Sequence, residues 1–394
     1  MQFKTLRDAG DVRGKRVLVR EDLNVPMDDG VIGDETRILA ALPTLAWLQE
    51  HGAKTIVLSH LGRPDGKPNP AFSLRPIAER LSEHLGIKVG FVEDCIGSDA
   101  EAASRAVPDG GVVLFENVRF HPEEEKNDPS FATALAQSGD LYVNDAFGTA
   151  HRAHASTAGI AADLPAYAGF LMESELAALS RLTDNPVKPF VCAIGGAKVA
   201  DKVGVFENLF ERVDAFVIGG GMANTFLAAL GINIGCSLHD HDLAPAKKII
   251  AHAKQHHIGL HLPHDVVVAD SFNADETAET VPLHDVGKRM ILDIGPHTAN
   301  AYADVLRAAK TIVFNGPMGV FEKKPYQNGT RMVGAAILVA TRAGAVSVVG
   351  GGDAAAAANE LGFAHGMTHV STGGGATLEF LEGKTLPGVA ALES

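Results

Sequence analysis

The segment PFVCAIGGAKVADKVGVF, residues 189–206, joins a glycine pair to two lysines in a pattern that is typical of phosphate binding. An apolar strand runs into Gly195 and Gly196, and a helix is predicted to open with Lys198 and Lys202. Such a junction aims backbone N–H groups at a ligand, and the helix dipole adds positive charge there. The two lysines are four residues apart, which predicts that they project from the same helix face and favours an anion between them. A solvated lysine pair after an ordinary turn stays open as the alternative.

Basic and polar side chains follow the predicted strands in the first half of the chain. Ligands of open parallel sheets bind beyond the carboxyl ends of the strands, which makes these side chains candidates. They are Arg20, Asp22, Asn24, Arg37, His60, Arg63, Arg119, Asn144, Asp145 and Arg152. A surface ion pair is the better explanation for any single arginine. Several arginines and a histidine at corresponding positions instead predict an anion site, because the planar guanidinium suits carboxylate and phosphate.

Glycine clusters follow the predicted strands in the second half. They are Gly195-Gly196, Gly219-Gly220-Gly221, Asn315-Gly316-Pro317, Gly350-Gly351-Gly352-Asp353 and Gly373-Gly374-Gly375. Glycine lets the backbone itself approach a ligand, and the last two clusters run straight into predicted helices. One glycine pair is a common tight turn. The repeated clusters predict a phosphate- or nucleotide-binding lobe, in which the Asp353 carboxylate suits Mg²⁺.

The two halves together predict phosphoryl transfer between an acidic small molecule and a nucleotide. Such chemistry needs positioning and positive charge at the moving group, and little covalent work by the protein. Two other nucleotide motifs fail. The GKT at 383–385 lacks the earlier glycine of a P-loop, since Leu378 stands there. The run from Gly350 to Ala355 fits a dinucleotide fingerprint, but the next strand ends at Ser371 without a carboxylate for ribose.

Composition excludes several classes of protein. A length of 394 residues predicts two domains of roughly 200 residues each. The net charge of −14 argues against nucleic-acid binding, and no apolar run approaches the ~20 residues that span a membrane. Cys95, Cys192 and Cys236 are far apart and indicate reduced thiols. The polar N-terminus predicts no signal peptide, so we expect a cytoplasmic protein.

Strands alternate with helices along the chain. This alternation predicts an α/β fold in which each half is a parallel sheet covered by helices on both faces. The predicted strands are Arg16–Arg20, Thr55–Leu58, Val112–Phe115, Leu141–Val143, Phe190–Ile194, Ala215–Ile218, Val266–Ala269, Ile291–Asp293, Ile312–Phe314, Val346–Val349 and a short one at Val370. The named helices are Ile38–Glu50, Leu74–Leu85 and Phe170–Leu182.

The domain boundaries are predicted from the helical run FLMESELAALSRL and the breaker TDNPVKP that follows it. We expect an N-terminal domain over 1–170, an interdomain helix over 171–184 and a C-terminal nucleotide-binding domain over 185–380. The residues 381–394 contain a prolyl-glycine, which predicts a non-helical tail lying across a surface. This tail is expected to pack back near the N-terminal domain.

Motifs of one known family occur in order throughout the chain. They are REDLNVP (20–26), SHLGRP (59–64), ENVRF (116–120), NDAFGTAHRAHAS (144–156), GGAKVADK (195–202), IGGGMANTF (218–226), FNGPMGVFE (314–322), VGGGD (349–353) and HVSTGGGA (369–376). On these motifs the chain resembles phosphoglycerate kinase over essentially its whole length. The resemblance implies transfer of the acyl phosphate of 1,3-bisphosphoglycerate to ADP, giving 3-phosphoglycerate and ATP, with Mg²⁺. It also implies two Rossmann-like lobes joined by a hinge helix, and a monomer.

The resemblance also implies roles for individual residues. Phosphoglycerate would bind in the N-terminal domain at Asp22, Leu23, Asn24, Arg37, His60, Leu61, Gly62, Arg63, Arg119 and Arg152. The nucleotide would bind at Gly195, Lys202, Gly220, Gly221, Pro317, Glu322, Gly350, Gly351, Gly352 and Asp353, with the metal at Asp353. The transferring phosphoryl group would be stabilised by Arg37, Lys198, Gly352 and Gly375.

Two positions depart from the family pattern. Glu21 stands where the family usually has an apolar residue, and strand alternation predicts that it points away from Asp22 with little effect on the site. Ala354 stands where Thr or Ser is usual, which removes a hydroxyl that could contact nucleotide phosphate. We therefore expect activity with weaker nucleotide affinity, and we expect Ala354→Thr to tighten ADP or ATP binding.

Two other classes of function were weighed against a small-molecule kinase. A nicotinamide-dependent dehydrogenase would use the run 350–355, but it requires the missing carboxylate. A non-catalytic nucleotide-binding scaffold predicts damage to Arg37, Lys198 or Asp353, and all three are intact. We expect direct in-line transfer, with His60 as a ligand of phosphoglycerate and not a phospho-carrier.

Overall fold

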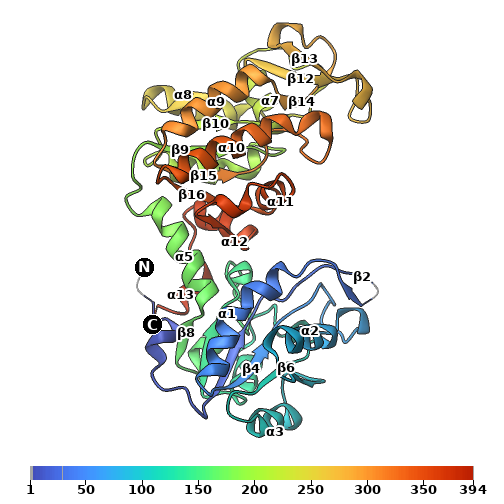
Figure 1. Ribbon diagram of the computed structural model, residues 1–394, viewed down its shortest axis with the longest axis vertical. Coiled ribbons are helices and arrows are strands. Elements are labelled where there is room, and N and C mark those ends of the chain that lie inside the picture. Colours follow the sequence, from blue (N-terminus) through green and yellow to red (C-terminus); the bar gives the residue numbers. More distant parts are fainter. Residues whose placement is uncertain (1–2, 29, 394) are drawn as a thin grey trace. The chain divides into compact units, whose positions relative to one another are not determined.

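The computed structural model describes residues 3–28 and 30–393, which form two compact units (Figure 1). The first unit contains residues up to Leu176 together with the C-terminal segment that starts at Thr385. The second unit runs from Ala177 to Lys384. The boundary therefore falls inside α5 (Phe170–Thr183), and each unit is described by itself.

The first unit is built on a six-stranded parallel sheet with the order β5-β6-β4-β1-β7-β8. Its strands are β1 (Arg16–Arg20), β4 (Lys54–Leu58), β5 (Gly90–Val92), β6 (Val112–Phe115), β7 (Leu141–Asn144) and β8 (Ala166–Ala168). In the centre, Arg20 at the end of β1 is in register with Leu58 of β4 and Asn144 of β7. Three neighbouring strands therefore end at one edge, and the loops that follow them meet there.

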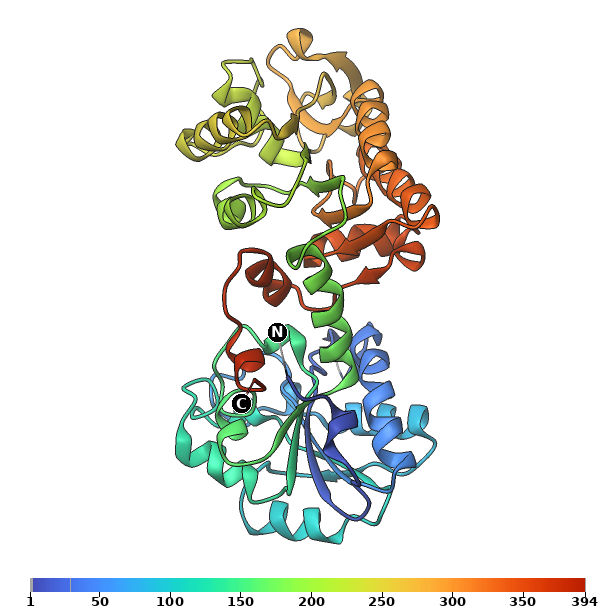
Figure 2. The ribbon, with the colours of Figure 1, turned by 90° about the vertical axis from the view of Figure 1, so that its left-hand side faces the viewer.

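Helices cover both faces of this sheet (Figure 2). One face, which includes Val17 and Val19, packs against α1 (Thr36–Glu50) and α2 (Arg75–Leu85). The other face, which includes Leu18, packs against α3 (Ser98–Ala106) and α4 (Pro129–Ala136). Successive residues of β1 are thus buried on opposite faces, as expected for a parallel sheet enclosed by helices. A short hairpin, β2 (Met27–Asp28) and β3 (Val31–Ile32), completes the elements before α1.

The second unit contains a second six-stranded parallel sheet, with the order β11-β10-β9-β15-β16-β17. Its strands are β9 (Phe190–Ile194), β10 (Ala215–Ile218), β11 (Gly259–His261), β15 (Thr311–Asn315), β16 (Val346–Val349) and β17 (His369–Val370). Its helices are α6 (Val203–Leu209), α7 (Gly220–Ala229), α8 (Ala244–Gln255), α9 (Pro296–Ala308), α10 (Asn328–Arg342), α11 (Gly352–Glu360) and α12 (Gly375–Leu381). The prediction of an α/β fold with two helix-covered parallel sheets is confirmed.

A separate antiparallel sheet corrects one detail of that prediction. The strands β12 (Asp265–Ala269) and β14 (Met290–Ile294) were expected in the parallel scheme, but both pair antiparallel in a sheet with β13 (Glu279–Pro282). The chain between β12 and β13 has room only for the short 3₁₀ turn Asp275–Thr277. A parallel return needs a crossover of a dozen or so residues, so antiparallel pairing is the geometry available.

The C-terminal segment corrects a second detail, because it contains a short helix. The helix α13 (Pro387–Ala390) begins at the prolyl-glycine that was expected to prevent it. Proline is tolerated at the first helical position, where its missing N–H has no partner to lose. Within the first unit, the Gly388 N–H donates to the carbonyl of Ala150 at 2.8 Å, and the Asn144 side-chain amide donates to the Gly388 carbonyl at 3.2 Å.

Candidate functional site

The first unit has a small charged pocket at the carboxyl ends of its strands, which we call the arginine pocket. It encloses about 230 Å³. It is lined by Asp22, Asn24, Arg37, His60, Gly62, Arg63, Arg119, Gly148, Thr149, His151 and Arg152. Four neighbouring strands supply the loops that carry most of these residues, because β6, β4, β1 and β7 are consecutive in the sheet.

Hydrogen bonds between the loops fix the shape of the arginine pocket. The Asn24 side-chain oxygen accepts the Gly62 N–H at 2.8 Å, which ties the loop after β1 to the loop after β4. The Arg119 guanidinium donates to the Gly62 carbonyl at 2.9 Å. Arg37, near the start of α1, donates to Asp22 at 2.7 Å. The guanidinium groups of Arg37 and Arg119 are therefore held in place before any ligand arrives.

Positive charge dominates the arginine pocket. Burial, with the neighbouring Arg20, lowers the pKa of Arg119 to about 10. Burial and the surrounding guanidinium groups hold the pKa of His60 well below its usual value, so this imidazole is neutral at physiological pH. Burial likewise lowers the pKa of His154, behind the pocket, to about 4. An anionic ligand would relieve the repulsion that these shifts report.

The structure divides the predicted substrate-binding residues into two groups. Those with side chains in the arginine pocket are Asp22, Asn24, Arg37, His60, Arg63, Arg119 and Arg152, with Gly62 as backbone. The side chains of Leu23 and Leu61 are instead buried in the core, and Arg20 is fully buried behind the pocket. Thr149 and His151 line the pocket but were missed, although both lie within the quoted stretch NDAFGTAHRAHAS.

The second unit has a larger pocket of about 580 Å³, which we call the glycine pocket. Four glycines lie in its wall, namely Gly196, Gly220, Gly221 and Gly319. Of the other predicted nucleotide-binding residues, Pro317, Glu322 and Asp353 also line it. Most of the remaining wall is apolar, which suits a flat heterocyclic ring better than a compact anion.

Two of the predicted glycines are required by close backbone approach. A Cβ on Gly195 would lie 1.9 Å from the Pro317 carbonyl oxygen. Gly220 has a φ of +66°, and a Cβ there would lie 2.7 Å from the Gly196 oxygen. The turn after β9 therefore packs directly against its neighbouring loops, and any side chain at these positions would separate them.

The two lysines that follow β9 do not share a helix face, which corrects the prediction. Lys198 lies in the turn and is exposed, whereas Lys202 ends a short 3₁₀ turn and caps α6. The Lys202 ammonium turns inward and donates to the carbonyls of Gly195, at 2.8 Å, and Asn315, at 2.5 Å. Burial lowers its pKa to about 8. The N–H groups of Val199 and Ala200 donate to the Asp240 carboxylate instead of to carbonyls of a preceding helical turn, and regular helix begins only at Val203.

The loop after β16 runs into α11 as the sequence predicts. Gly351 has a φ of +102° and precedes the helix, and Gly352 and Asp353 form its first turn, where both are exposed. Gly375 is the first residue of α12 and is also exposed. Ala354, in the first turn of α11, is buried in the core. The effect of its missing hydroxyl on nucleotide affinity stays a prediction.

One wall of the glycine pocket was not predicted from the sequence. It is formed by β14, by Val266 of β12 with the preceding Pro263, and by Phe272, Val320 and Phe321. Asp293 of β14 is buried in this wall and accepts the N–H groups of Ile294 at 2.9 Å and Gly329 at 2.8 Å. Burial raises its pKa to about 8. The sequence signal for this wall was only an apolar strand, which does not distinguish a pocket wall from core.

A parallel α/β fold with an arginine pocket in one unit and a glycine-lined pocket in the other defines a nucleotide-dependent phosphotransferase class. Comparison with known proteins gives the family. The family model for phosphoglycerate kinase matches residues 6–384. The phosphoglycerate kinase of Chloroflexus aurantiacus is 55% identical over 100% of this chain and 99% of its own length. That of Pelotomaculum thermopropionicum is 52% identical over the same shares.

Solved structures agree with the sequence comparison. The phosphoglycerate kinase of Coxiella burnetii superposes with a TM-score of 0.91 at 43% identity, covering 99% of each chain. That of Pyrococcus horikoshii gives a TM-score of 0.83 at 35% identity, covering 99% of this chain and 98% of its own. The chain therefore belongs to the phosphoglycerate kinase family. Its function is that of the family, ATP-dependent phosphoryl transfer to a carboxyl acceptor.

Proposed function

We propose that the arginine pocket binds 3-phosphoglycerate or 1,3-bisphosphoglycerate, that the glycine pocket binds ADP or ATP, and that the acyl phosphate passes directly between them. The observation that carries this proposal is the unequal chemistry of the two pockets. One is small and cationic, with four arginines, and the other is larger and mainly apolar, with backbone exposed at its glycines. A phosphorylated acid suits the first and a nucleoside suits the second.

Phosphoglycerate would be held by charge-assisted hydrogen bonds. Arg63, Arg119 and Arg152 offer planar donor groups to its phosphate and carboxylate. His60 would add a neutral N–H donor. Asp22 and Asn24 would accept a hydrogen bond from the phosphoglycerate hydroxyl, and Gly62 would contribute main-chain atoms. Leu23 and Leu61, being buried, contribute through their main chain only.

The nucleotide would place its base in the apolar part of the glycine pocket and its phosphates near Lys202. The lysine ammonium has three N–H donors, of which two serve Gly195 and Asn315. The third is available to a phosphate oxygen. Gly220, Gly221, Pro317 and Glu322 would flank the nucleoside, and the loop Gly350–Asp353 would approach the phosphates.

The transferring phosphoryl group would be stabilised by donors from both units. Arg37 and Lys198 supply side-chain charge, and Gly352 and Gly375 supply backbone N–H groups at helix starts. These groups would act on charge that develops in the transition state, which is where such interactions accelerate a reaction. Water must be excluded during the transfer, because an acyl phosphate hydrolyses readily.

The donor set of the second unit fits Mg²⁺. Asp353 presents an exposed carboxylate that lines the glycine pocket. Magnesium is commonly held by one or two carboxylates together with substrate phosphates, so a single aspartate is sufficient protein ligand. Bound there with the nucleotide, Mg²⁺ would supply neutralisation of phosphate charge.

Separate ligand titrations and an activity assay test this proposal. We expect ADP formation from ATP, Mg²⁺ and 3-phosphoglycerate, with hydroxylamine present to trap the acyl phosphate. By calorimetry, Arg119→Ala should lose 3-phosphoglycerate binding and keep ATP binding, whereas Lys202→Ala should do the reverse. Arg105→Ala, an exposed arginine of α3, is the matched control. Loss of both ligands in either variant would contradict the assignment of one ligand to each pocket.

Three further features complete the proposal. We propose that the protein acts as a monomer in the cytoplasm, which sedimentation and fractionation test. No helix within residues 3–28 and 30–393 is long and apolar enough to cross a membrane. Transfer is expected without a phosphoenzyme, so trapping a phosphohistidine at His60 would contradict direct transfer.

A further inference from the structure

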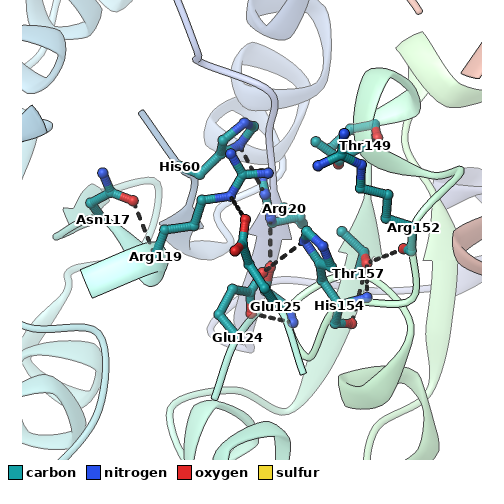
Figure 3. Close-up of polar contacts among 12 residues, drawn as sticks. Arg20, His60, Asn117, Arg119, Glu124, Glu125, Thr149, Arg152, His154 and Thr157 are labelled. Atoms are coloured by element: carbon teal, nitrogen blue, oxygen red, sulfur yellow. Dashed lines mark hydrogen bonds and ion pairs between the residues drawn. The ribbon is translucent and has the colours of Figure 1, made fainter. Parts of the chain in front are cut away.

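A buried network of Arg20, Glu124 and Ser156 lies directly behind the arginine pocket, and none of these three residues lines the pocket. Figure 3 shows Arg20 between the ring of His60 and Glu124. Arg20 and Glu124 are both fully buried, as is Ser156. A buried charge is costly unless it is paired and hydrogen-bonded, so the burial of these charged groups requires an explanation.

The hydrogen bonds form one chain from Glu124 to His60. The Ser156 hydroxyl donates to Glu124 Oε1 at 2.6 Å, and the Ser156 N–H donates to Oε2 at 2.9 Å. The same hydroxyl accepts Arg20 Nε at 2.7 Å. Arg20 also donates to the Glu21 carbonyl, and its other terminal nitrogen lies 3.1 Å from His60 Nδ1. The guanidinium is thereby fixed from three sides.

The last contact determines the chemistry of the His60 ring. Arginine has only donors, so His60 Nδ1 must accept and cannot carry a proton. The ring proton is then on Nε2, and the neutral tautomer presents this N–H as a donor. His60 itself lines the arginine pocket. Which nitrogen of a histidine is protonated is commonly set by the partner of the other nitrogen.

We propose that Glu124 and Ser156 are positioning residues that hold Arg20 against His60 Nδ1, so that His60 serves phosphoglycerate as a neutral Nε2–H donor. This inference rests on the ligand proposed above for the arginine pocket. The groups that hold the pKa of His60 down are Arg20 from β1, Arg37 from α1, Arg119 after β6 and His154, and all of them oppose a proton on the ring. The other charged or titratable groups of the same pocket are Asp22, Arg63, His151 and Arg152.

The tautomer can be measured in the ligand-free enzyme by long-range ¹H–¹⁵N correlation of the histidine rings, with His60→Gln assigning the signals. We expect unprotonated Nδ1 and protonated Nε2 at neutral pH. An imidazolium ring near neutral pH, or a proton on Nδ1, would overturn the proposal. The tautomer itself is read from the unsubstituted protein, and His60→Gln serves only to assign the signals.

Ser156→Ala tests the relay itself. We expect a mixture of tautomers and a KM for 3-phosphoglycerate raised about fivefold to tenfold, with kcat changed less than about twofold. Ser104→Ala is the control, because Ser104 is also fully buried and donates to Glu101 within α3. If Ser156→Ala matches Ser104→Ala in both tautomer and KM, the relay is wrong. If the tautomer is as expected but phosphoglycerate binds elsewhere, the ligand assignment fails and the positioning stands.

Discussion

The arginine pocket and the glycine pocket lie at equivalent edges of two similar sheets, yet their walls are made from different parts of the chain. In the first unit the groups that line the pocket are mainly side chains, which reach it from four neighbouring strand ends. In the second they are mainly backbone and apolar surface, brought close by glycines. The difference fits the ligands proposed above, because a compact acid needs many point charges and a nucleoside needs a flat apolar slot.

The comparison also concerns rigidity. The arginine pocket is held by long-range hydrogen bonds between loops, such as Asn24 with Gly62 and Arg20 with Ser156. The glycine pocket is held by contacts that allow no side chain, such as Gly195 against Pro317. Substitutions should therefore act differently in the two units. Charge removal should weaken the first pocket, and added bulk should weaken the second.

The largest effect is expected at Lys198, the exposed lysine of the glycine unit. Lys198→Ala should lower kcat about 100- to 1000-fold and change either KM less than about threefold, because its charge is needed only in the transition state. Steady-state kinetics with both substrates measures this. Lys248→Ala, an exposed lysine of α8, is the control. A pure KM effect would move Lys198 to a binding role.

The next effect separates side-chain recognition from backbone recognition. Arg119→Ala should raise the KM for 3-phosphoglycerate about 30- to 100-fold, since a charge-assisted hydrogen bond with two donors is lost. Arg119→Lys should recover only part of this, because lysine lacks the planar fork. The KM for ATP should not change in either variant. Full recovery of the KM for 3-phosphoglycerate by Arg119→Lys would show that the pocket recognises charge alone.

A smaller effect is expected from bulk at the glycine pocket. Gly220→Ala should raise the KM for ATP about tenfold, because its Cβ would lie 2.7 Å from the Gly196 oxygen at a φ of +66°. Gly231→Ala is a matched control, since Gly231 has a φ of +79° with nothing within 4 Å. If both substitutions raise the KM for ATP equally, backbone strain and not the close approach to Gly196 is the cause.

Much of the fold follows from local sequence. The bounds of β1, β6, β9, β10 and β16 agree with the prediction, because continuous runs of β-branched and aromatic residues specify buried strands directly. The antiparallel sheet was misplaced because periodicity identifies a strand but not its partner. The pairing of β12 depends on the short connection to β13, a constraint on the path of the chain.

The lining of the two pockets was predictable where it depends on strand ends and not where it depends on distant partners. Arg20 looked equivalent to the other arginines, but it is buried by Ser156, which lies 136 residues away in the sequence. Lys202 likewise turns toward Asn315, which lies 113 residues away, instead of pairing with Lys198 on a helix. Nothing near either residue in the sequence shows that its side chain has a partner inside the protein.

Glu21 is a fully buried carboxyl group of the first unit, and its substitution tests whether the arginine pocket depends on such groups. Both Glu21 oxygens are buried without a hydrogen-bond partner among the described residues, and burial, with the nearby Asp145, raises its pKa well above the usual value. The folded state therefore holds a proton that the unfolded chain releases above pH ~4.3. This stabilises the protein at low pH and is lost as pH rises, by up to about 1.4 kcal/mol per pH unit.

Glu21→Gln should remove this pH dependence and leave activity unchanged. The unfolding free energy of the variant minus that of the wild type should be at least about 1 kcal/mol larger at pH 8 than at pH 5. The reason is that glutamine matches the protonated carboxyl group in shape and cannot ionise. Denaturant titrations at both pH values measure this difference. Other carboxyl groups with a raised pKa, such as Asp293, are present in both proteins, so their contributions cancel in this difference.

The control is Glu79→Gln at an exposed position of α2, which should show no such difference. A raised KM for 3-phosphoglycerate in Glu21→Gln would instead show that this carboxyl supports Arg20, and so extend the side-chain network of the first unit by one residue.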